Sequence, residues 1–231
     1  MTGIERGGTL AMVRNDFAGA RKTNESLLAP LERRLAPWVV PRIPRWLETH
    51  HLTLLTLVWC AGILWFSAKA AADLRWLWLV SLMIVLQWAT DHFDGKVGKF
   101  RNTGLVKWGF YMDHLLDYVF LCTVVAGYAW ILPDRSAFDL LCLLAVFGGF
   151  MAHSFLSMSV NETLQISYVK LGPTEFRLAL VIINALVIRF GAATMAHALP
   201  YTAVGGGVAL AILVYVTQRK IWGTDLSAKN A

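Results

Sequence analysis

Residues 91–117 read DHFDGKVGKFRNTGLVKWGFYMDHLLD and place two pairs of aspartates in an otherwise apolar chain. Asp91 and Asp94 are three residues apart, and Asp113 and Asp117 are four apart, so each pair shares one face of a helix. Long apolar runs lie on the outer side of each pair, and a short connection joins the two pairs. We therefore expect two adjacent helix ends at which four carboxylates converge at one depth.

These carboxylates predict a divalent metal site beside a phosphate site. Carboxylates crowded at the edge of a bilayer are unfavourable unless a cation neutralises them. Hard divalent cations prefer oxygen ligands, and Mg²⁺, or Mn²⁺ in its place, also handles phosphates. Three glycines would let a ligand approach the backbone: Gly95, Gly98 and Gly109. Three basic residues would attract an anionic phosphate: Lys96, Lys99 and Arg101.

The composition indicates a membrane protein. Of the 231 residues, 57% are hydrophobic and 16% are charged, whereas a soluble domain is usually about 45–50% apolar. Ten Trp and six Tyr suit two membrane interfaces. The three cysteines fall in apolar runs without paired spacing, which predicts neither disulfides nor a zinc site. The net charge of +6 does not indicate a nucleic-acid partner, because the basic residues lie mostly in short loops and the N-terminal segment.

The apolar runs predict an all-α integral membrane fold with six transmembrane helices after an N-terminal amphipathic surface helix. The expected spans are 51–71, 75–99, 105–132, 138–160, 174–196 and 199–221, with joints at Pro133, Pro173 and Pro200. Residues 1–24 would form a loose tail, 25–48 the amphipathic segment, 49–222 the six-helix domain and 223–231 a second tail.

The distribution of basic residues predicts the orientation. All but four of the 21 Lys and Arg residues fall on the side of the N-terminus; the exceptions are Lys69, Arg75, Arg135 and Arg189. Cytoplasmic loops of membrane proteins carry such an excess. Both termini and the aspartates are therefore expected in the cytosol.

The spacing of the aspartates and glycines resembles the motif of the CDP-alcohol phosphotransferase family. That motif is Asp-x2-Asp-Gly-x2-Ala-Arg, followed by Gly-x3-Asp-x3-Asp, and it matches here at the four aspartates and at Gly95 and Gly109. Gly98-Lys99 stands where the family has Ala-Arg. Lysine keeps the charge but loses bidentate phosphate binding, for which Arg101 would compensate.

The resemblance implies six spans, a cytosolic active site, a homodimer and two divalent ions among the four aspartates. It implies that Asp91, Asp94 and Asp113 are metal ligands and that Asp117 is a ligand or the general base. A CDP-linked donor would bind there, and an alcohol would attack its β-phosphate and release CMP. Because eukaryotic members are much longer, the resemblance also suggests the cytoplasmic membrane of a bacterium or archaeon.

Short matches favour a substrate class. Asp94-Gly95-Lys96, Asp113-His114 and Thr174-Glu175 resemble the choline/ethanolamine branch, in which the histidine is the proposed proton acceptor. This favours a CDP-choline or CDP-ethanolamine donor and diacylglycerol or a similar lipid alcohol as acceptor. His114 would be the base or a neighbour that orients it. The alternative in the same family is a CDP-diacylglycerol-dependent transfer to a polar alcohol such as inositol phosphate, glycerol phosphate, serine or choline.

Two further hypotheses stay open. Asn161, Glu162 and Glu175 lie near the cytosolic side and would either contact a headgroup or acceptor or cap a helix. A different class of protein is a carboxylate-lined cation or proton transporter. The paired glycine spacing argues against it, because a transporter has no need of it.

Overall fold

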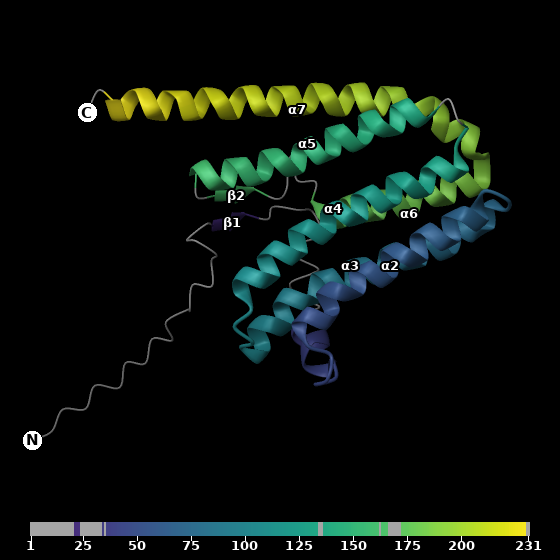
Figure 1. The fold of residues 1–231 in the computed structure, drawn as a ribbon, viewed down its shortest axis with the longest axis horizontal. Helices are drawn as coiled ribbons and strands as arrows, with labels where there is room; N and C mark the ends of the chain where they lie inside the picture. The colour runs from purple at the N-terminus through teal and green to yellow at the C-terminus, as the bar shows by residue number, and fades with distance from the viewer. Residues whose placement is uncertain are drawn as a thin grey trace, which may run out of the picture.

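A computed structural model describes residues 21–23, 34, 36–133, 136–161, 163–165 and 172–229. Of the predicted N-terminal tail only residues 21–23 are described, and of the predicted amphipathic segment residues 34 and 36–48 are described. The six long helices are α2 (Thr49–Ala70), α3 (Leu77–Arg101), α4 (Val106–Ile131), α5 (Ala137–Asn161), α6 (Pro173–Phe190) and α7 (Ala192–Lys229) (Figure 1). Two short 3₁₀ helices are η2 (Val40–Arg42) and η3 (Leu74–Trp76), and two three-residue strands, β1 (Arg21–Thr23) and β2 (Thr163–Gln165), pair in parallel. The predicted all-α class is therefore confirmed apart from this small strand pair.

Four of the helices are long and apolar enough to cross a membrane, namely α2, α4, α5 and α7. This indicates a membrane protein. Helices α3 and α6 fall outside this group of four among the described residues. Helix α3 carries the two aspartates, and α6 carries Glu175, Arg177 and Arg189, so their charge lowers their hydropathy.

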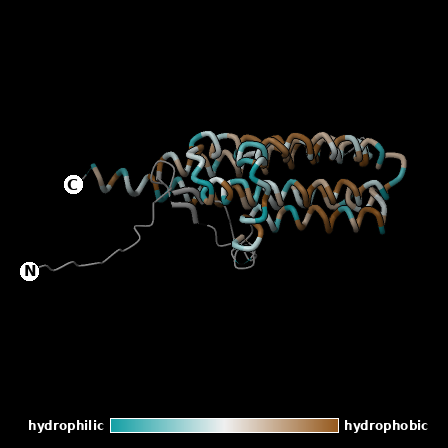
Figure 2. Tube along the Cα trace, turned by 90° about the horizontal axis from the view of Figure 1, so that it is seen from below, coloured by the Kyte–Doolittle hydropathy of each residue, from teal (hydrophilic) through white to brown (hydrophobic). Residues whose placement is uncertain are grey.

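The long helices pack as a closed ring. Each helix contacts the next in the order α2, α3, α6, α7, α5, α4 and back to α2. Figure 1 shows α7 alongside α5 on one side of the bundle, while α2 and α3 lie on the other. In Figure 2 hydrophobic residues follow the helices, and hydrophilic residues gather toward the end where the chain termini lie. The aspartate-bearing ends of α3 and α4 belong to this hydrophilic end.

The first four predicted spans agree closely with α2 to α5, but the joint before the last helix is wrong. Pro133 lies between α4 and α5 and Pro173 is the first residue of α6, so both mark joints as predicted, whereas Pro200 lies inside α7. The chain breaks instead at Gly191, whose φ of 87° is a conformation that glycine adopts readily. Proline bends a helix without always ending it, and Figure 1 shows α7 bending near its start. Helix α7 also continues to Lys229, through the predicted tail at 223–231.

A buried polar network joins three helices below the aspartates. The Tyr128 hydroxyl donates to Asn184 Oδ1 at 2.7 Å, and Asn184 Nδ2 donates to Ser81 Oγ at 3.0 Å. Asn184 has no exposed surface. Such bonds hold transmembrane helices together, and here they fix α3, α4 and α6 to one another. These hydrogen bonds therefore fix the relative positions of the helices that carry the candidate site.

Candidate functional site

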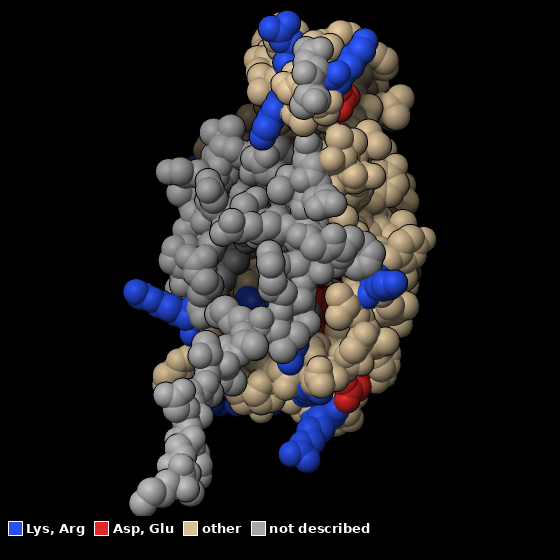
Figure 3. Space-filling model, turned by 90° about the vertical axis from the view of Figure 1, so that its left-hand side faces the viewer, with Lys and Arg blue, Asp and Glu red and all other residues tan. Residues whose placement is uncertain are grey.

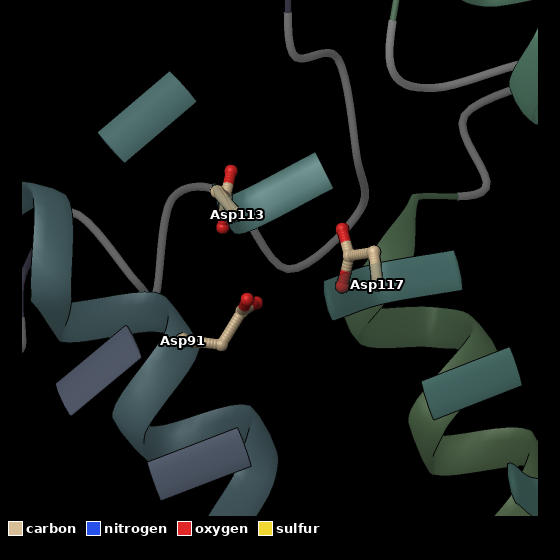
Figure 4. Close-up of side chains that lie close together, drawn as sticks. All are labelled: Asp91, Asp113 and Asp117. Atoms are coloured by element: carbon tan, nitrogen blue, oxygen red, sulfur yellow. The ribbon is translucent and has the colours of Figure 1, made fainter. Parts of the chain in front are cut away.

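Three of the four predicted aspartates converge. Asp91 projects from α3, and Asp113 and Asp117 project from successive turns of α4 (Figure 4). One carboxylate oxygen from each lies within 4.8 Å of the others. The separation of four residues places Asp113 and Asp117 on one face of α4, as predicted. An all-oxygen set of this size suits a hard divalent cation such as Mg²⁺.

Asp94 lies apart from this trio and faces α2. Its side chain is 8% exposed and accepts a hydrogen bond from the Thr53 hydroxyl at 2.7 Å. It also accepts from the backbone N–H of Gly95. The expected convergence of four carboxylates is thus realised for three, because the position three residues after Asp91 points to the neighbouring helix.

The site contains an arginine that the sequence analysis did not assign to it. Arg177 lies in α6 and is 5% exposed. Its Nη2 donates to Asp91 Oδ2 at 3.0 Å and to Asp117 Oδ1 at 2.8 Å. Its Nε donates to Gln87 Oε1 at 2.6 Å. A charged residue inside an apolar run was the available signal, because such residues are rare in spans and usually functional.

His114 is held in one tautomer beside the trio. Its Nδ1 lies 2.7 Å from the carbonyl oxygen of Phe110, one turn earlier, and 3.5 Å from Asp113 Oδ2. Since a carbonyl oxygen only accepts, Nδ1 carries a proton, and in the neutral imidazole Nε2 then carries the lone pair. The ring packs edge-on against Phe155 of α5. This arrangement gives the imidazole a proton-accepting nitrogen at a fixed orientation.

The predicted basic residues take different places. Arg101 donates to the backbone carbonyls of Ile43, Pro44 and Leu47 at 2.8–3.0 Å, so it ties the segment before α2 to the end of α3. Lys96 contacts His92, one turn earlier on α3, and Lys99 is exposed. Arg101 therefore has a structural partner in place of the predicted phosphate contact.

The three glycines also differ. A Cβ atom at Gly95 or Gly109 would meet no atom within 4 Å, which leaves open space beside the aspartates. A Cβ at Gly98 would lie 3.0 Å from Thr49 Oγ1. Gly98 thus allows α3 to pack against the start of α2, whereas the other two leave room for a ligand.

The predicted headgroup residues are only partly described. Glu175 accepts a hydrogen bond from the backbone N–H of Gly172 at 2.9 Å, which is the helix-capping arrangement at the start of α6. Asn161 ends α5, and its side chain lies outside the described part, as does Glu162. Only the capping interaction of Glu175 can therefore be assigned.

Basic side chains surround this end of the molecule. Figure 3 views it from the side on which Figure 1 marks N and C, and Lys and Arg side chains stand around its edge with few Asp or Glu. Clusters of one charge raise the local concentration of oppositely charged ligands. This end of the molecule therefore favours approach of an anion.

No protein-family model matches this chain, and no curated protein is similar to it in sequence. The assignment of function consequently depends on the motif spacing and on the geometry of the site.

Proposed function

We propose that this protein is a metal-dependent CDP-alcohol phosphotransferase of the membrane. The observation that carries the proposal is the convergence of Asp91, Asp113 and Asp117 from two helices, within 4.8 Å, in a chain that spaces its aspartates and glycines as that family does. Open space at Gly95 and Gly109 leaves room for a bulky ligand beside these carboxylates. The Lys and Arg side chains around the edge of this end suit a diphosphate ligand.

The donor set fits the divalent cations that the family motif implies. Asp91, Asp113 and Asp117 would hold one ion, and Asp94, which lies apart from them and is oriented by Thr53, would contribute to a second. When bound, such ions supply Lewis-acid stabilisation of the diphosphate and of the departing CMP. Mg²⁺ is the ion that best suits carboxylate ligands and phosphate substrates together, with Mn²⁺ as a substitute.

The chain's own residues would then position the reactants and move one proton. The acceptor alcohol forms a bond from its oxygen to the β-phosphorus, and the bond from that phosphorus to the bridging oxygen breaks, so that CMP leaves with the bridging oxygen. His114 Nε2 takes the alcohol proton, since Nδ1 is already engaged with Phe110. A CDP-choline or CDP-ethanolamine donor and a lipid alcohol acceptor are the preferred substrates, on the sequence matches around His114.

We further propose that α3 and α6 also cross the membrane, which makes six spans. Both are members of the closed ring that they form with the four apolar helices, and the side chains of Asp91 and Arg177 are 19% and 6% exposed. Membrane-embedded charges face the bundle interior in this way. At the far end of the bundle the basic residues are few among the described residues, namely Lys69 in the last turn of α2, Arg75 in η3 and Arg189 in the last turn of α6. This asymmetry supports an orientation with the site and both termini in the cytosol.

A second candidate function is favoured by one observation. The pairing of Arg177 with Asp91 and Asp117 would also suit a proton or cation pathway, in which ion pairs break and re-form. Such a pathway would not release CMP from any nucleotide. It would instead acidify or load the interior of a vesicle, which separates the two functions.

The test is CMP release by purified protein with Mg²⁺ and CDP-choline, CDP-ethanolamine or CDP-diacylglycerol in turn. The wild-type protein should release CMP from one donor class, and Asp113→Asn should not. Asp225→Asn, which changes an exposed aspartate of α7, serves as the matched control and should retain activity. No CMP from any donor, together with proton or cation flux in vesicles, would refute the transferase proposal.

A further inference from the structure

Arg177 contacts two of the three carboxylates that would hold a divalent cation. Its Nη2 touches Asp91 Oδ2 and Asp117 Oδ1, and these two residues belong to the carboxylate trio. We propose that Arg177 is a built-in counter-cation that releases the two carboxylates to the metal and, in exchange, binds a phosphate of the donor. This inference rests on the proposed function, because it concerns the same site.

The metal ion and the guanidinium compete for the carboxylates of Asp91 and Asp117. A Mg²⁺ ion binds carboxylate oxygens at about 2.0–2.1 Å and demands near-octahedral geometry. Arg177 Nη2 lies 3.0 and 2.8 Å from its two oxygens and carries the same sign of charge as the ion. Two cations held this close in a poorly hydrated site repel each other strongly. The guanidinium must therefore turn its Nη2 away when the ion binds.

The other end of the guanidinium keeps it at the site. Arg177 Nε is bound to Gln87 Oε1 at 2.6 Å, and the guanidinium carbon lies 5.4 Å from the centre of the Phe120 ring. Gln87 has no exposed surface. Release of the carboxylates therefore needs a rotation of the Nη end only, which leaves the positive charge close by.

Charge balance identifies what the released guanidinium would bind. Four carboxylates and one guanidinium leave three negative charges, and two divalent ions bring four positive ones. The loaded site would thus carry an excess positive charge that a diphosphate neutralises. Guanidinium groups match phosphate oxygens bidentately.

A second buried donor lies beside Arg177. Gln87 Nε2 is buried with no hydrogen-bond partner among the described residues, and it shares a carbon atom with the oxygen that binds Arg177. An unpaired buried donor is unfavourable, and an acceptor oxygen would satisfy it. A phosphate oxygen or a bridging water next to Arg177 would supply that acceptor.

The exchange predicts linked binding of metal and donor. Mg²⁺ alone must displace Arg177 without a new partner for it, so it binds weakly. Mg²⁺ with a diphosphate gives the guanidinium a new partner, so it binds more tightly. A purely structural arginine would instead hold the helices together whether or not metal is present.

The experiment measures thermal unfolding of the full-length protein in detergent during a Mg²⁺ titration, with and without cytidine diphosphate. In the wild type, cytidine diphosphate should lower the half-saturating Mg²⁺ concentration. In Arg177→Met, the unfolding midpoint should fall in EDTA and recover with Mg²⁺. Its half-saturating concentration should be at least about tenfold lower than that of the wild type, the size expected for one charge-assisted hydrogen bond. In Arg177→Met, cytidine diphosphate should no longer lower the half-saturating Mg²⁺ concentration.

Arg189→Met is the matched control, because Arg189 lies in the last turn of the same helix and is exposed. It should behave as the wild type. Gln87→Leu is the second variant, since it loosens Arg177 without changing charge. It should lower the half-saturating Mg²⁺ concentration several-fold.

Equal half-saturating concentrations in the wild type and in Arg177→Met would overturn the exchange. So would an Arg177→Met protein that stays unfolded at saturating Mg²⁺ while Gln87→Leu titrates like the wild type. Both outcomes leave the metal site and the proposed function standing. A wild-type protein that shows no response to Mg²⁺ would refute the proposed function together with the exchange.

Discussion

Two buried threonines one turn apart on α2 differ only in the partner of their hydroxyl group. Thr53 is 2% exposed, and its hydroxyl lies 2.7 Å from Asp94 Oδ2. Thr49 is 6% exposed, and its hydroxyl is buried without a hydrogen-bond partner among the described residues. Replacing each by valine preserves the shape and removes only the hydroxyl. The Thr53 hydroxyl also lies 3.1 Å from the backbone carbonyl oxygen of Thr49. The comparison of Thr53→Val with Thr49→Val therefore tests a hydroxyl that has hydrogen-bond partners, Asp94 among them, against one that has none among the described residues.

The burial and hydrogen bonding of the two hydroxyl groups determine how far the two variants should differ in their free energy of unfolding. A hydrogen bond to a charged group contributes about 1.5–3 kcal/mol, and Asp94 is too buried for water to replace the lost donor fully. Thr53→Val should thus lower the free energy of unfolding by about 2 kcal/mol, or very roughly 4–8 °C in the unfolding midpoint for a chain of this length. Thr49→Val removes an unpaired buried hydroxyl, which costs about 1–3 kcal/mol to bury. It should leave stability unchanged or raise it.

The assay is thermal unfolding in one detergent without added metal, followed by CMP release with Mg²⁺. Thr53→Val should lose stability and at least about tenfold in rate, since a misplaced ligand weakens transition-state stabilisation. Thr49→Val should keep both. Equal losses in the two variants would show that the hydroxyl groups act through packing and would refute the assigned role of Thr53.

Three further predictions concern the site and its support. His114→Ala should slow CMP release by about 10²–10⁴-fold and leave the Mg²⁺-dependent shift of the unfolding midpoint intact; wild-type turnover would contradict a role as base. Asp113→Asn should abolish both CMP release and most of the Mg²⁺ response, and a retained response in calorimetry would remove Asp113 from the metal site. Gly127→Ala should destabilise the protein by about 1–3 kcal/mol, because its Cβ would lie 2.6 Å from Ser67 Oγ. Gly205→Ala, where a Cβ would meet no atom within 4 Å, is the matched control for thermal unfolding, and an equal loss there would contradict the packing argument.

Most of the correct predictions came from the spacing of residues that are close together in the sequence. The helix periodicity put Asp113 and Asp117 on one face, and the short connection from α3 brought Asp91 beside them. Apolar length predicted α2 to α5 within a few residues. These features depend on neighbours in the chain, so a single sequence contains them.

Features that depend on distant segments were missed. Arg177 pairs with residues 60 and 86 positions away, and no local pattern predicts such partners. A residue three positions after another is turned by about 60° around a helix, which was enough to aim Asp94 at α2. Arg101 shows a related limit, because backbone carbonyls from a distant segment can also bind a guanidinium.

The length of α7 has a practical consequence for imaging. Its 38 residues span about 57 Å, well beyond the roughly 30 Å of a bilayer's hydrocarbon layer. The helix continues unbroken to Lys229 on the side where α3 ends. A small membrane protein gives single-particle methods little mass to align. A helical fusion partner joined in phase after Lys229 would extend α7 as a rigid handle and report the orientation of the bundle.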